Sequence, residues 1–295
     1  MDRRAVLAGL GAFGVIGCAP HEAAEGTPPP TAPERLDLSA LERGGGRLGF
    51  AVHDTGSGRV LQWRGDERFV YCSTFKMYLA AATFLRVQDE QESLDRLVPI
   101  TAADMISHAP VTRPAVGGAL TVETLMKGAV EVSDNPAANL LLKAMGGLDD
   151  MQAFYRSIGD RSTRVDRFEP EMNRLDGDKD TIQPLQSVAN LHHLLVDPAS
   201  PLSNASRETL LGWMIASPTG AARLKAGAPS DWTVAHKTGT GGYGPTNDIG
   251  VLYPPRGAPV VVAAYHHAAP ASPEARNEAV IAQGVRIALQ TLGHG

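Results

Sequence analysis

Ser73 and Lys76 are the first pair in this sequence whose residue types and spacing suit nucleophilic chemistry. The segment Ser-Thr-Phe-Lys over residues 73–76 opens a run of good helix formers, so a spacing of three puts both side chains on one helix face. A serine hydroxyl needs a neighbouring base, and a partly desolvated lysine can accept its proton. The positive end of the helix would also stabilise an oxyanion. Alone, the pattern is weak, because this spacing often arises by chance on exposed helices.

Ser133-Asp134-Asn135 directly precedes Pro136 and a second helical run. One interpretation is a helix start, with Asp134 or Ser133 as the N-cap and the proline at an early helical position. The other interpretation is chemical. Ser133 would then pass a proton between Lys76 and a leaving nitrogen, and Asn135 would hold a substrate carbonyl. Taken alone, the motif favours the helix start.

Lys237-Thr238-Gly239 ends a segment with strand character that begins near Thr233. The structural interpretation is a strand that runs into the glycine-rich turn that follows. The chemical interpretation is a site for a substrate carboxylate, since lysine and threonine offer a cation and a hydroxyl group. Gly239 would permit close approach of a ligand backbone. The single motif does not decide between the two.

The three motifs, in this order and at these separations, are a known signature of class A β-lactamases and penicillin-binding proteins. The sequence resembles the class A serine β-lactamases over almost all of residues 33–292. That resemblance implies an α+β fold of the β-lactamase/transpeptidase type: an α/β/α sandwich built from both termini, with about five antiparallel strands, plus an all-helical lobe. It also implies hydrolysis of the β-lactam amide bond of penicillins and cephalosporins through an acyl-enzyme on Ser73, and hence antibiotic resistance.

A fourth motif, Arg-Phe-Glu-Pro-Glu-Met-Asn over residues 167–173, resembles the omega-loop segment of the same family. The resemblance implies that Glu169 and Asn173 hold the hydrolytic water, and that Arg167 pairs with Asp180 to close the loop. A carboxylate that activates water frees the acyl-enzyme, which separates a β-lactamase from a penicillin-binding protein. The alternative is a solvated acidic turn, because Glu-Pro-Glu is common in turns. The stretch from Asn173 to Asp180 is somewhat shorter than is usual in the family, which is one departure.

Further substrate contacts are implied by the same resemblance. The backbone N–H groups of Ser73 and Thr240 would form the oxyanion hole. Arg223 would lie near the carboxylate site, as in family members that use an arginine there; the alternative is an ordinary surface arginine. His108 falls where the family usually has an aromatic residue at the mouth of the cleft, which is a second departure.

The elements that must position these residues follow from hydrophobic periodicity. We expect a short helix over Pro33–Leu41, strands near both ends of the chain and a mostly helical middle over residues 70–215. The expected strands are Leu48–Asp54, Val60–Trp63, Val234–Thr240, Asn247–Tyr253 and Pro259–Tyr265, and the expected helices include Met77–Val87, Val122–Val130, Pro136–Met145, Leu185–Leu195 and Pro273–Leu292. Residues 35–68 and 216–295 would then form a sheet lobe and residues 69–215 a helical lobe, with a cleft between them.

Composition narrows the choice of function without specifying it. The 295 residues can bury a large core, and 43% hydrophobic with 20% charged residues is ordinary for a soluble globular protein. A net charge of -5 gives no electrostatic footprint for nucleic acid. The histidines lack zinc-ligand spacing, so we expect no metal and no cofactor. Nothing demands a partner, so we expect a monomer.

The first residues resemble an export signal. Arg3 and Arg4 precede a short apolar run, as in a twin-arginine signal, and the run ends in Val-Ile-Gly-Cys, which resembles a lipobox. We expect a signal peptide over residues 1–17, lipidation of Cys18 and a flexible tether over residues 18–34. Residues 35–295 would then be the β-lactamase domain, in the periplasm or another extracytoplasmic compartment. The alternative is a plain secretory signal in which Cys18 is incidental.

Cys72, beside Ser73, is the second of the two cysteines. If Cys18 carries lipid, Cys72 has no partner and the domain folds without a disulfide. Family members with broad carbapenem activity bridge this position to a second cysteine, which falls at about Gly241 here. The resemblance therefore argues against carbapenem hydrolysis.

Two rival functions stay open at this point. One is a penicillin-binding protein or D,D-peptidase acting on peptidoglycan stems, and the other is a non-catalytic lipoprotein that keeps the fold as a binding module. The choice between Lys76 and Glu169 as the base for acylation is open as well.

Overall fold

The computed structural model describes residues 32–242, 244–268 and 271–294. The predicted signal peptide, Cys18 and most of the predicted tether lie outside these residues. Among the helices of the described part, none is both long enough and apolar enough to cross a membrane.

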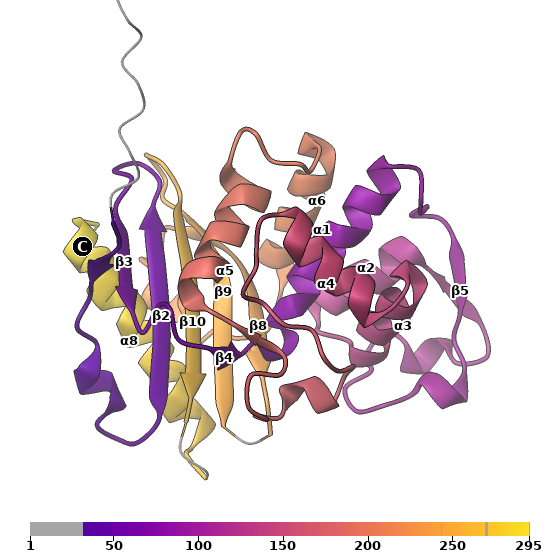
Figure 1. Cartoon of the computed structure of the whole chain (residues 1–295), viewed down its shortest axis with the longest axis horizontal. Helices are drawn as coiled ribbons and strands as arrows, with labels where there is room; N and C mark the ends of the chain where they lie inside the picture. Colours follow the sequence, from indigo (N-terminus) through magenta and orange to yellow (C-terminus); the bar gives the residue numbers. More distant parts are fainter. Residues whose placement is uncertain (1–31, 243, 269–270, 295) are drawn as a thin grey trace, which may run out of the picture. The chain divides into compact units, whose positions relative to one another are not determined.

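A six-stranded sheet is built from the two ends of the described chain (Figure 1). Its strand order is β1-β3-β2-β10-β9-β8, and all neighbours are antiparallel except β1 and β3. The strands are β1 (Glu34–Arg35), β2 (Arg47–Asp54), β3 (Val60–Trp63), β8 (Thr233–Thr240), β9 (Pro245–Tyr253) and β10 (Val260–His267). The prediction of about five antiparallel strands from both termini is confirmed, with β1 as a short parallel addition.

Helices cover both faces of this sheet, because both sets of alternating side chains on the central strand β10 are apolar, one set on each face. Val260, Val262 and Ala264 pack with Ile281 and Val285 of α8 (Glu274–Leu292). The opposite face packs against α5 (Pro184–Leu191) and the helical lobe, through Val261, Ala263 and Tyr265. A sheet buried on both faces needs nearly continuous apolar residues in its central strands, which β10 has from Val260 to Tyr265.

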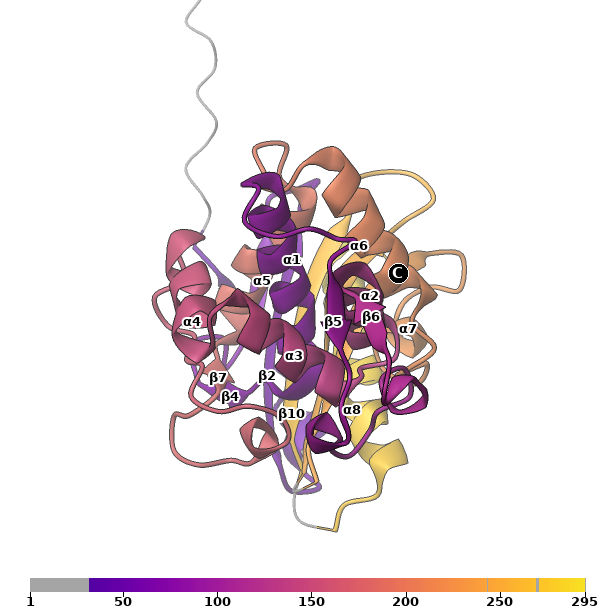
Figure 2. The same ribbon diagram turned by 90° about the vertical axis from the view of Figure 1, so that its right-hand side faces the viewer.

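The helical lobe lies beside β8, the edge strand (Figures 1 and 2). Its centre is α1 (Phe75–Gln88), in which every residue from Phe75 to Phe84 is buried, including the polar ones. A helix that is buried all round must be surrounded, and α1 packs against the other helices of the lobe. These are α2 (Val122–Glu131), α3 (Asn135–Met145), α4 (Leu148–Ser157) and α6 (Asn204–Ala216).

Two short strand pairings and one short helix complete the described fold. The short strand β4 (Phe69–Val70) pairs with β7 (Thr181–Ile182), and this pair ties the start of the helical lobe to the end of the omega loop. A second pair, β5 (Leu97–Pro99) with β6 (Ala119–Thr121), lies at the far side of the helical lobe (Figure 2). The four-residue helix α7 (Leu224–Gly227) packs against α8.

The predicted helix over Pro33–Leu41 is wrong. Residues 34–35 form β1, and a 3-10 turn occupies Ser39–Glu42. Leu36 and Leu38 are both buried while Asp37 between them is exposed, so the segment follows a period of two and packs against the sheet. The predicted helix over Leu185–Leu195 is also partly wrong, since α5 ends at Leu191 and a π-helical turn continues over His192–Val196.

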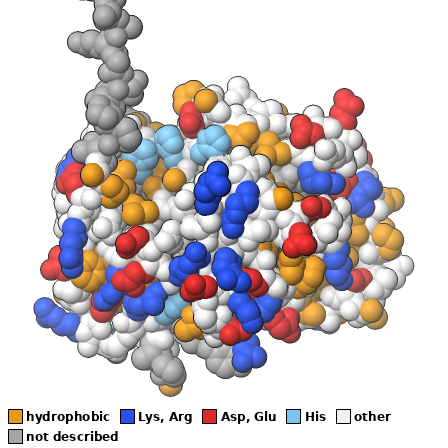
Figure 3. Space-filling model, viewed as in Figure 1, with side chains coloured by type: hydrophobic (Ala, Val, Ile, Leu, Met, Phe, Trp, Pro, Cys, Tyr) orange, Lys and Arg blue, Asp and Glu red, His pale blue; other side chains and the backbone are white. Residues whose placement is uncertain are grey.

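Charges of both signs are mixed over the face drawn in Figure 3, where Lys and Arg lie among Asp and Glu. Ion pairs occur among the charged residues of the described chain, such as Arg64 Nε with Glu42 Oε1 at 2.9 Å and Arg59 with Glu34 at 2.8 Å. Interspersed charges give a weak net field, in keeping with the small net charge of the chain.

Candidate active site

Ser73 lies in a 3-10 turn, Cys72–Thr74, that leads directly into α1. Strand β8 presses against this turn, since a Cβ at Gly239 would lie 2.7 Å from Tyr71 O and 3.1 Å from Cys72 Cβ. Glycine is therefore needed for the two backbones to come this close, and the approach is to the protein's own turn. It sets the backbone of the next residue, Thr240, beside Ser73, as an oxyanion hole made from both N–H groups requires.

Lys76 is fully buried beneath Ser73, one helical turn along. Its Nζ donates to Ser73 Oγ at 2.9 Å and to the Ser133 carbonyl at 2.8 Å, and it also bonds Asn135 Oδ1. Glu169 Oε1 lies 3.1 Å from the same Nζ. Burial lowers the pKa of Lys76 below its usual range, although the Glu169 carboxylate opposes that shift. A lysine with a lowered pKa, touching a serine hydroxyl, is equipped to accept its proton.

Ser133 lies between two buried lysines. Its Oγ accepts from Lys237 Nζ at 3.0 Å and lies 3.4 Å from Lys76 Nζ. Ser133 adopts a φ of 61°, and Asp134 then caps α3 by accepting from Ala137 N at 2.9 Å. The motif is thus a helix start, as one interpretation predicted, and it also brings a hydroxyl group into the lysine pair.

Lys237 on β8 carries no exposed surface. Burial, and then repulsion from Lys76, lower its pKa well below the usual value, while the Asp248 carboxylate acts in the opposite direction. Its Nζ donates to Ser133 Oγ and to Thr238 O. Together with the Arg223 guanidinium group, Lys237 brings N–H donors to the sheet side of the site, which suit an anionic substrate.

Glu169 reaches the nucleophile from the omega loop, defined here as residues 166–180. Its Oε1 accepts from Ser73 Oγ at 3.2 Å, and its carboxylate is fully buried. The backbone of Glu169 is clamped by Asn139 of α3, whose Oδ1 accepts from Glu169 N at 3.0 Å and whose Nδ2 donates to Glu169 O at 2.8 Å. Sequence reasoning missed Asn139. Its position four residues after Asn135, on the same face of α3, is the signal that could have found it.

Asn173 completes the pocket around the Glu169 carboxylate. Its Nδ2 donates to Glu169 Oε2, so its amide is oriented with Oδ1 turned elsewhere. Among the described residues, that buried Oδ1 has no hydrogen-bond partner. A buried acceptor needs a donor, and a water that donates to Asn173 Oδ1 and Glu169 would supply one.

The omega loop is closed by the ion pair between Arg167 and Asp180, with Nε 2.6 Å from Oδ2. Asp180 is fully buried, and its Oδ1 also accepts from the backbone N–H groups of Asp166 and Arg167 and from the Tyr71 hydroxyl group. One carboxylate therefore anchors both the start of the loop and the segment before Ser73.

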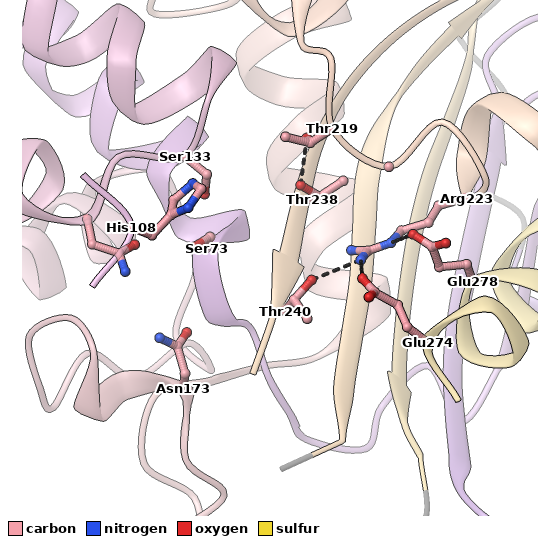
Figure 4. A pocket seen from close by; sticks show the side chains of 12 residues that line it. Ser73, His108, Ser133, Asn173, Thr219, Arg223, Thr238, Thr240, Glu274 and Glu278 are labelled. Carbon is pink, nitrogen blue, oxygen red and sulfur yellow. Dashed lines mark hydrogen bonds and ion pairs between the residues drawn. The ribbon is translucent and has the colours of Figure 1, made fainter. Parts of the chain in front are cut away.

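A cavity of about 360 Å³ opens above Ser73 between the two lobes (Figure 4). In Figure 4 the helical-lobe side presents Ser73, Ser133 and His108, and the sheet side presents Thr238, Thr240 and Arg223. Thr219, which sequence reasoning also missed, bonds Thr238 through their hydroxyl groups at 2.9 Å. The cavity is lined by Ser73, His108, Ser133, Asn135, Asn173, Thr219, Gly220, Arg223, Thr238, Thr240, Glu274 and Glu278.

Arg223 is 3% exposed, so the alternative of an ordinary surface arginine is wrong. Its guanidinium group donates to Asn247 O at 2.9 Å and to Thr240 Oγ1 at 2.9 Å, on the sheet side of the cavity. Glu278 of α8 pairs with Nε at 3.0 Å, and Glu274 lies 3.6 Å from Nη2. These two acidic residues were not predicted, and no motif marks them.

Cys72 is a buried free thiol behind Ser73. A Cβ at Gly241 would lie 3.3 Å from its Sγ, so Gly241 adjoins Cys72, as expected for the position that carries the second cysteine in bridged family members. The same Cβ would lie only 2.7 Å from Asn173 O. A cysteine there would therefore displace the omega loop, and low activity toward carbapenems stays a prediction.

The chain matches the model of the beta-lactamase enzyme family over residues 34–292. It is 44% identical to beta-lactamase L2 of Stenotrophomonas maltophilia over 261 residues, which cover 87% of this chain and 85% of the relative. It is 40% identical to the carbapenem-hydrolyzing beta-lactamase KPC of Klebsiella oxytoca, with 84% of this chain and 85% of the relative covered.

Solved structures agree with these relatives. The class A beta-lactamase of the last common ancestor of Gram-negative bacteria has a TM-score of 0.83 and 47% identity, and covers 86% of this chain and 97% of its own. A beta lactamase from Xanthomonas campestris pv. campestris has a TM-score of 0.82 and 41% identity, and covers 87% of this chain and 96% of its own.

Proposed function

The chain belongs to the beta-lactamase enzyme family and is a class A serine β-lactamase, a hydrolase that confers antibiotic resistance, and from this premise we propose the role of each residue in its site. Ser73 is the nucleophile, Lys76 and Ser133 carry protons, and Glu169 activates the water that ends the cycle. Neither the family match nor the relatives lend support to a penicillin-binding protein.

Acylation begins when Ser73 Oγ attacks the β-lactam carbonyl. Two bases lie within hydrogen-bond reach of this hydroxyl group, Lys76 at 2.9 Å and Glu169 at 3.2 Å. The lowered pKa of Lys76 favours it as the direct acceptor. The negative oxygen that develops would lie between the backbone N–H groups of Ser73 and Thr240. Ser133, which touches both lysines, passes a proton to the departing nitrogen.

The substrate is held by groups on both sides of the cavity. Its carboxylate binds to Lys237, Thr238 and Arg223, in the buried positive region on the sheet side. Asn135 and the backbone of Gly239 and Thr240 orient its amide. Penicillins and cephalosporins both carry the carboxylate and the amide that this arrangement recognises.

Deacylation is carried by Glu169, and the contact of its carboxylate with Ser73 Oγ is the single observation on which this proposal depends. Because Oε1 is next to the ester oxygen of the acyl-enzyme, a water that donates to the Glu169 carboxylate beside this contact would be activated close to the bond to be broken. The unpartnered Asn173 Oδ1 supports a water at that place. Arg167 and Asp180 hold the loop in position.

The test combines turnover with mass measurement on the purified chain. We expect nitrocefin hydrolysis by the wild type, none by Ser73→Ala, and at most a transient adduct of a cephalosporin on Ser73. A stable adduct with negligible turnover would assign the protein to the penicillin-binding class. The absence of both adduct and colour change would leave only a binding function.

Export and lipidation are separate proposals, because residues 1–31 lie outside the described part of the chain. The twin-arginine-like segment and the lipobox support secretion with Cys18 as a lipid anchor. Expression in cells with radioactive palmitate should label the wild type but not Cys18→Ala. Equal labelling of both would contradict the anchor, and light scattering of the soluble domain tests the predicted monomer.

A further inference from the structure

His236 and Asp248 form a buried pair behind the substrate cavity. His236 precedes Lys237 on β8, Asp248 lies on β9, and neither side chain has any exposed surface. His236 Nδ1 is 2.9 Å from one carboxylate oxygen of Asp248 and 3.0 Å from the other. The catalytic cycle above makes no use of either residue.

The contact defines the tautomer of His236. Only a nitrogen that carries hydrogen can donate to a carboxylate, so Nδ1 carries the proton. Within the described residues, Nε2 is buried without a partner. The one hydrogen-bond partner of the ring among these residues is therefore Asp248.

Asp248 in turn holds the chain at Arg223 from two sides. Its Oδ2 accepts from Leu224 N at 3.1 Å, which is the peptide N–H directly after Arg223. The carbonyl of Asn247, the residue before Asp248, accepts from the Arg223 guanidinium group at 2.9 Å. A displaced Asp248 would thus move both the backbone and the side chain of Arg223.

The turn at Gly220 lies close to both residues. Gly220 has a φ of 63°, and its carbonyl accepts from Arg223 N at 2.9 Å. A Cβ on Gly220 would lie 3.4 Å from His236 Cε1 and 3.4 Å from Arg223 Cδ, and closer still to the Thr238 methyl group. The ring and the arginine side chain therefore both border this turn, and loss of the ring would leave space beside the turn that leads into Arg223.

We propose that His236 is a positioning residue for substrate recognition, which holds Arg223 on the carboxylate of the β-lactam by orienting Asp248. The inference rests on the proposed role of Arg223. Loss of His236 should therefore weaken recognition of the substrate carboxylate and leave the chemical steps at the β-lactam carbonyl unchanged. A misplacement of the guanidinium group by about 1 Å is enough to cost a large factor in rate.

The experiment compares a cephalosporin with its methyl ester, which lacks the carboxylate charge. For His236→Ala we expect kcat/KM to fall about tenfold on the acid and to stay unchanged on the ester. In the Arg223→Ala background, the same substitution should have no further effect on the acid, since the group that it positions is gone. His266→Ala, which removes a buried histidine from β10, is the matched control and should leave the acid-to-ester ratio unchanged.

Conservative variants keep the test sharp if the alanine variant folds poorly. His236→Asn places an amide N–H where Nδ1 stands and should restore the wild-type ratio, whereas His236→Gln places it where Nε2 stands and should not. Equal losses on acid and ester, or an undiminished effect in the Arg223→Ala background, would overturn the inference. Failure of the proposed function is distinguishable, because the wild type itself would then hydrolyse neither compound.

Discussion

The two walls of the active site are built differently. One, called here the acylation wall, consists of Ser73, Lys76, Ser133 and Lys237 on or beside α1, α3 and β8. The other, the deacylation wall, consists of Glu169 and Asn173 on the omega loop, where the only regular structure is a 3-10 turn over Glu171–Asn173. The first is positioned by regular elements of the core and the second by a few side-chain clamps.

The difference follows from what each wall has to do. In the acylation wall, both lysines are fully buried and share Ser133, so no member can change without the others. The deacylation wall reaches this cluster at one carboxylate, and its clamps are Asn139 and the Arg167–Asp180 pair. We infer that the formation of the acyl-enzyme depends mainly on the first wall and its hydrolysis on the second. Substitutions in the second wall should then slow hydrolysis more than acylation.

Glu169→Ala should have the largest effect on turnover and should distinguish the two walls most clearly. We expect steady-state turnover to fall about 10³-fold or more, because a general base is lost, while Ser73 is still acylated with Lys76 as base. Electrospray mass measurement should then find the covalent adduct of a cephalosporin in nearly every molecule. Loss of acylation together with turnover would instead assign the acylation base to Glu169, and unchanged turnover would show that another group activates the water.

Asp180→Asn tests whether the omega loop depends on its buried anchor. The amide has no charge and only one acceptor oxygen, so the ion pair with Arg167 is lost, and we expect a loss of about 2 kcal/mol in the free energy of unfolding and deacylation slowed roughly 10- to 100-fold. Single-turnover kinetics should show the acylation rate nearly unchanged. Asp178→Asn is the matched control, since its exposed carboxylate belongs to the same loop but lies 3.7 Å from Arg68 rather than near Arg167. A similar loss in both variants would argue against the anchor.

Asn139→Ala should have a smaller effect of the same kind. It removes two hydrogen bonds to the backbone of Glu169, so the carboxylate is less well placed and deacylation should slow about tenfold. Gln152 offers a matched control, because its amide clamps Thr163 O and Val165 N in the same way, just before the loop. Gln152→Ala should lower the melting temperature without slowing deacylation. The idea fails if the two variants slow deacylation equally.

The sequence predicted the acylation wall better than the supports behind it. Ser73, Lys76, Ser133 and Lys237 lie in three short motifs whose residue types suit one chemistry, and the structure brings all four together. Asn139 and Thr219 act through one amide and one hydroxyl group, residue types that also occur throughout the surface. Asn139 shares a helix face with Asn135, which is a weak signal, and nothing near Thr219 in the sequence marks it; only the folded chain brings the two residues to Glu169 and Thr238.

The fold shows the same division between strong and weak local signals. Strands β2, β8, β9 and β10 and helices α1, α2, α3 and α8 were predicted to within a few residues, because their apolar residues repeat regularly. Residues 33–41 were misassigned because Leu36 and Leu38 alternate with Asp37 over too few positions to outweigh the helix formers around them. The outcome was decided by the pairing of β1 with β3, a contact between separate segments that local propensity does not encode.

Lys237→Met tests how the acylation wall affects the stability of the fold. Burial and the Lys76 charge lower the pKa of Lys237, so between the lowered value and about 10.4 the unfolded chain binds more protons than the folded one. By linkage, the free energy of unfolding of the wild type therefore rises with pH across that range, and this slope should shrink in the variant. At pH below the lowered pKa the variant should be more stable by about 1 kcal/mol, although inactive.

Lys127→Met, which removes an ammonium group from the surface of α2, should change neither quantity. A less stable Lys237→Met would mean that the hydrogen bonds to Ser133 and Thr238 outweigh the cost of burying the charge. The acylation wall would then stabilise the fold instead of lowering its stability.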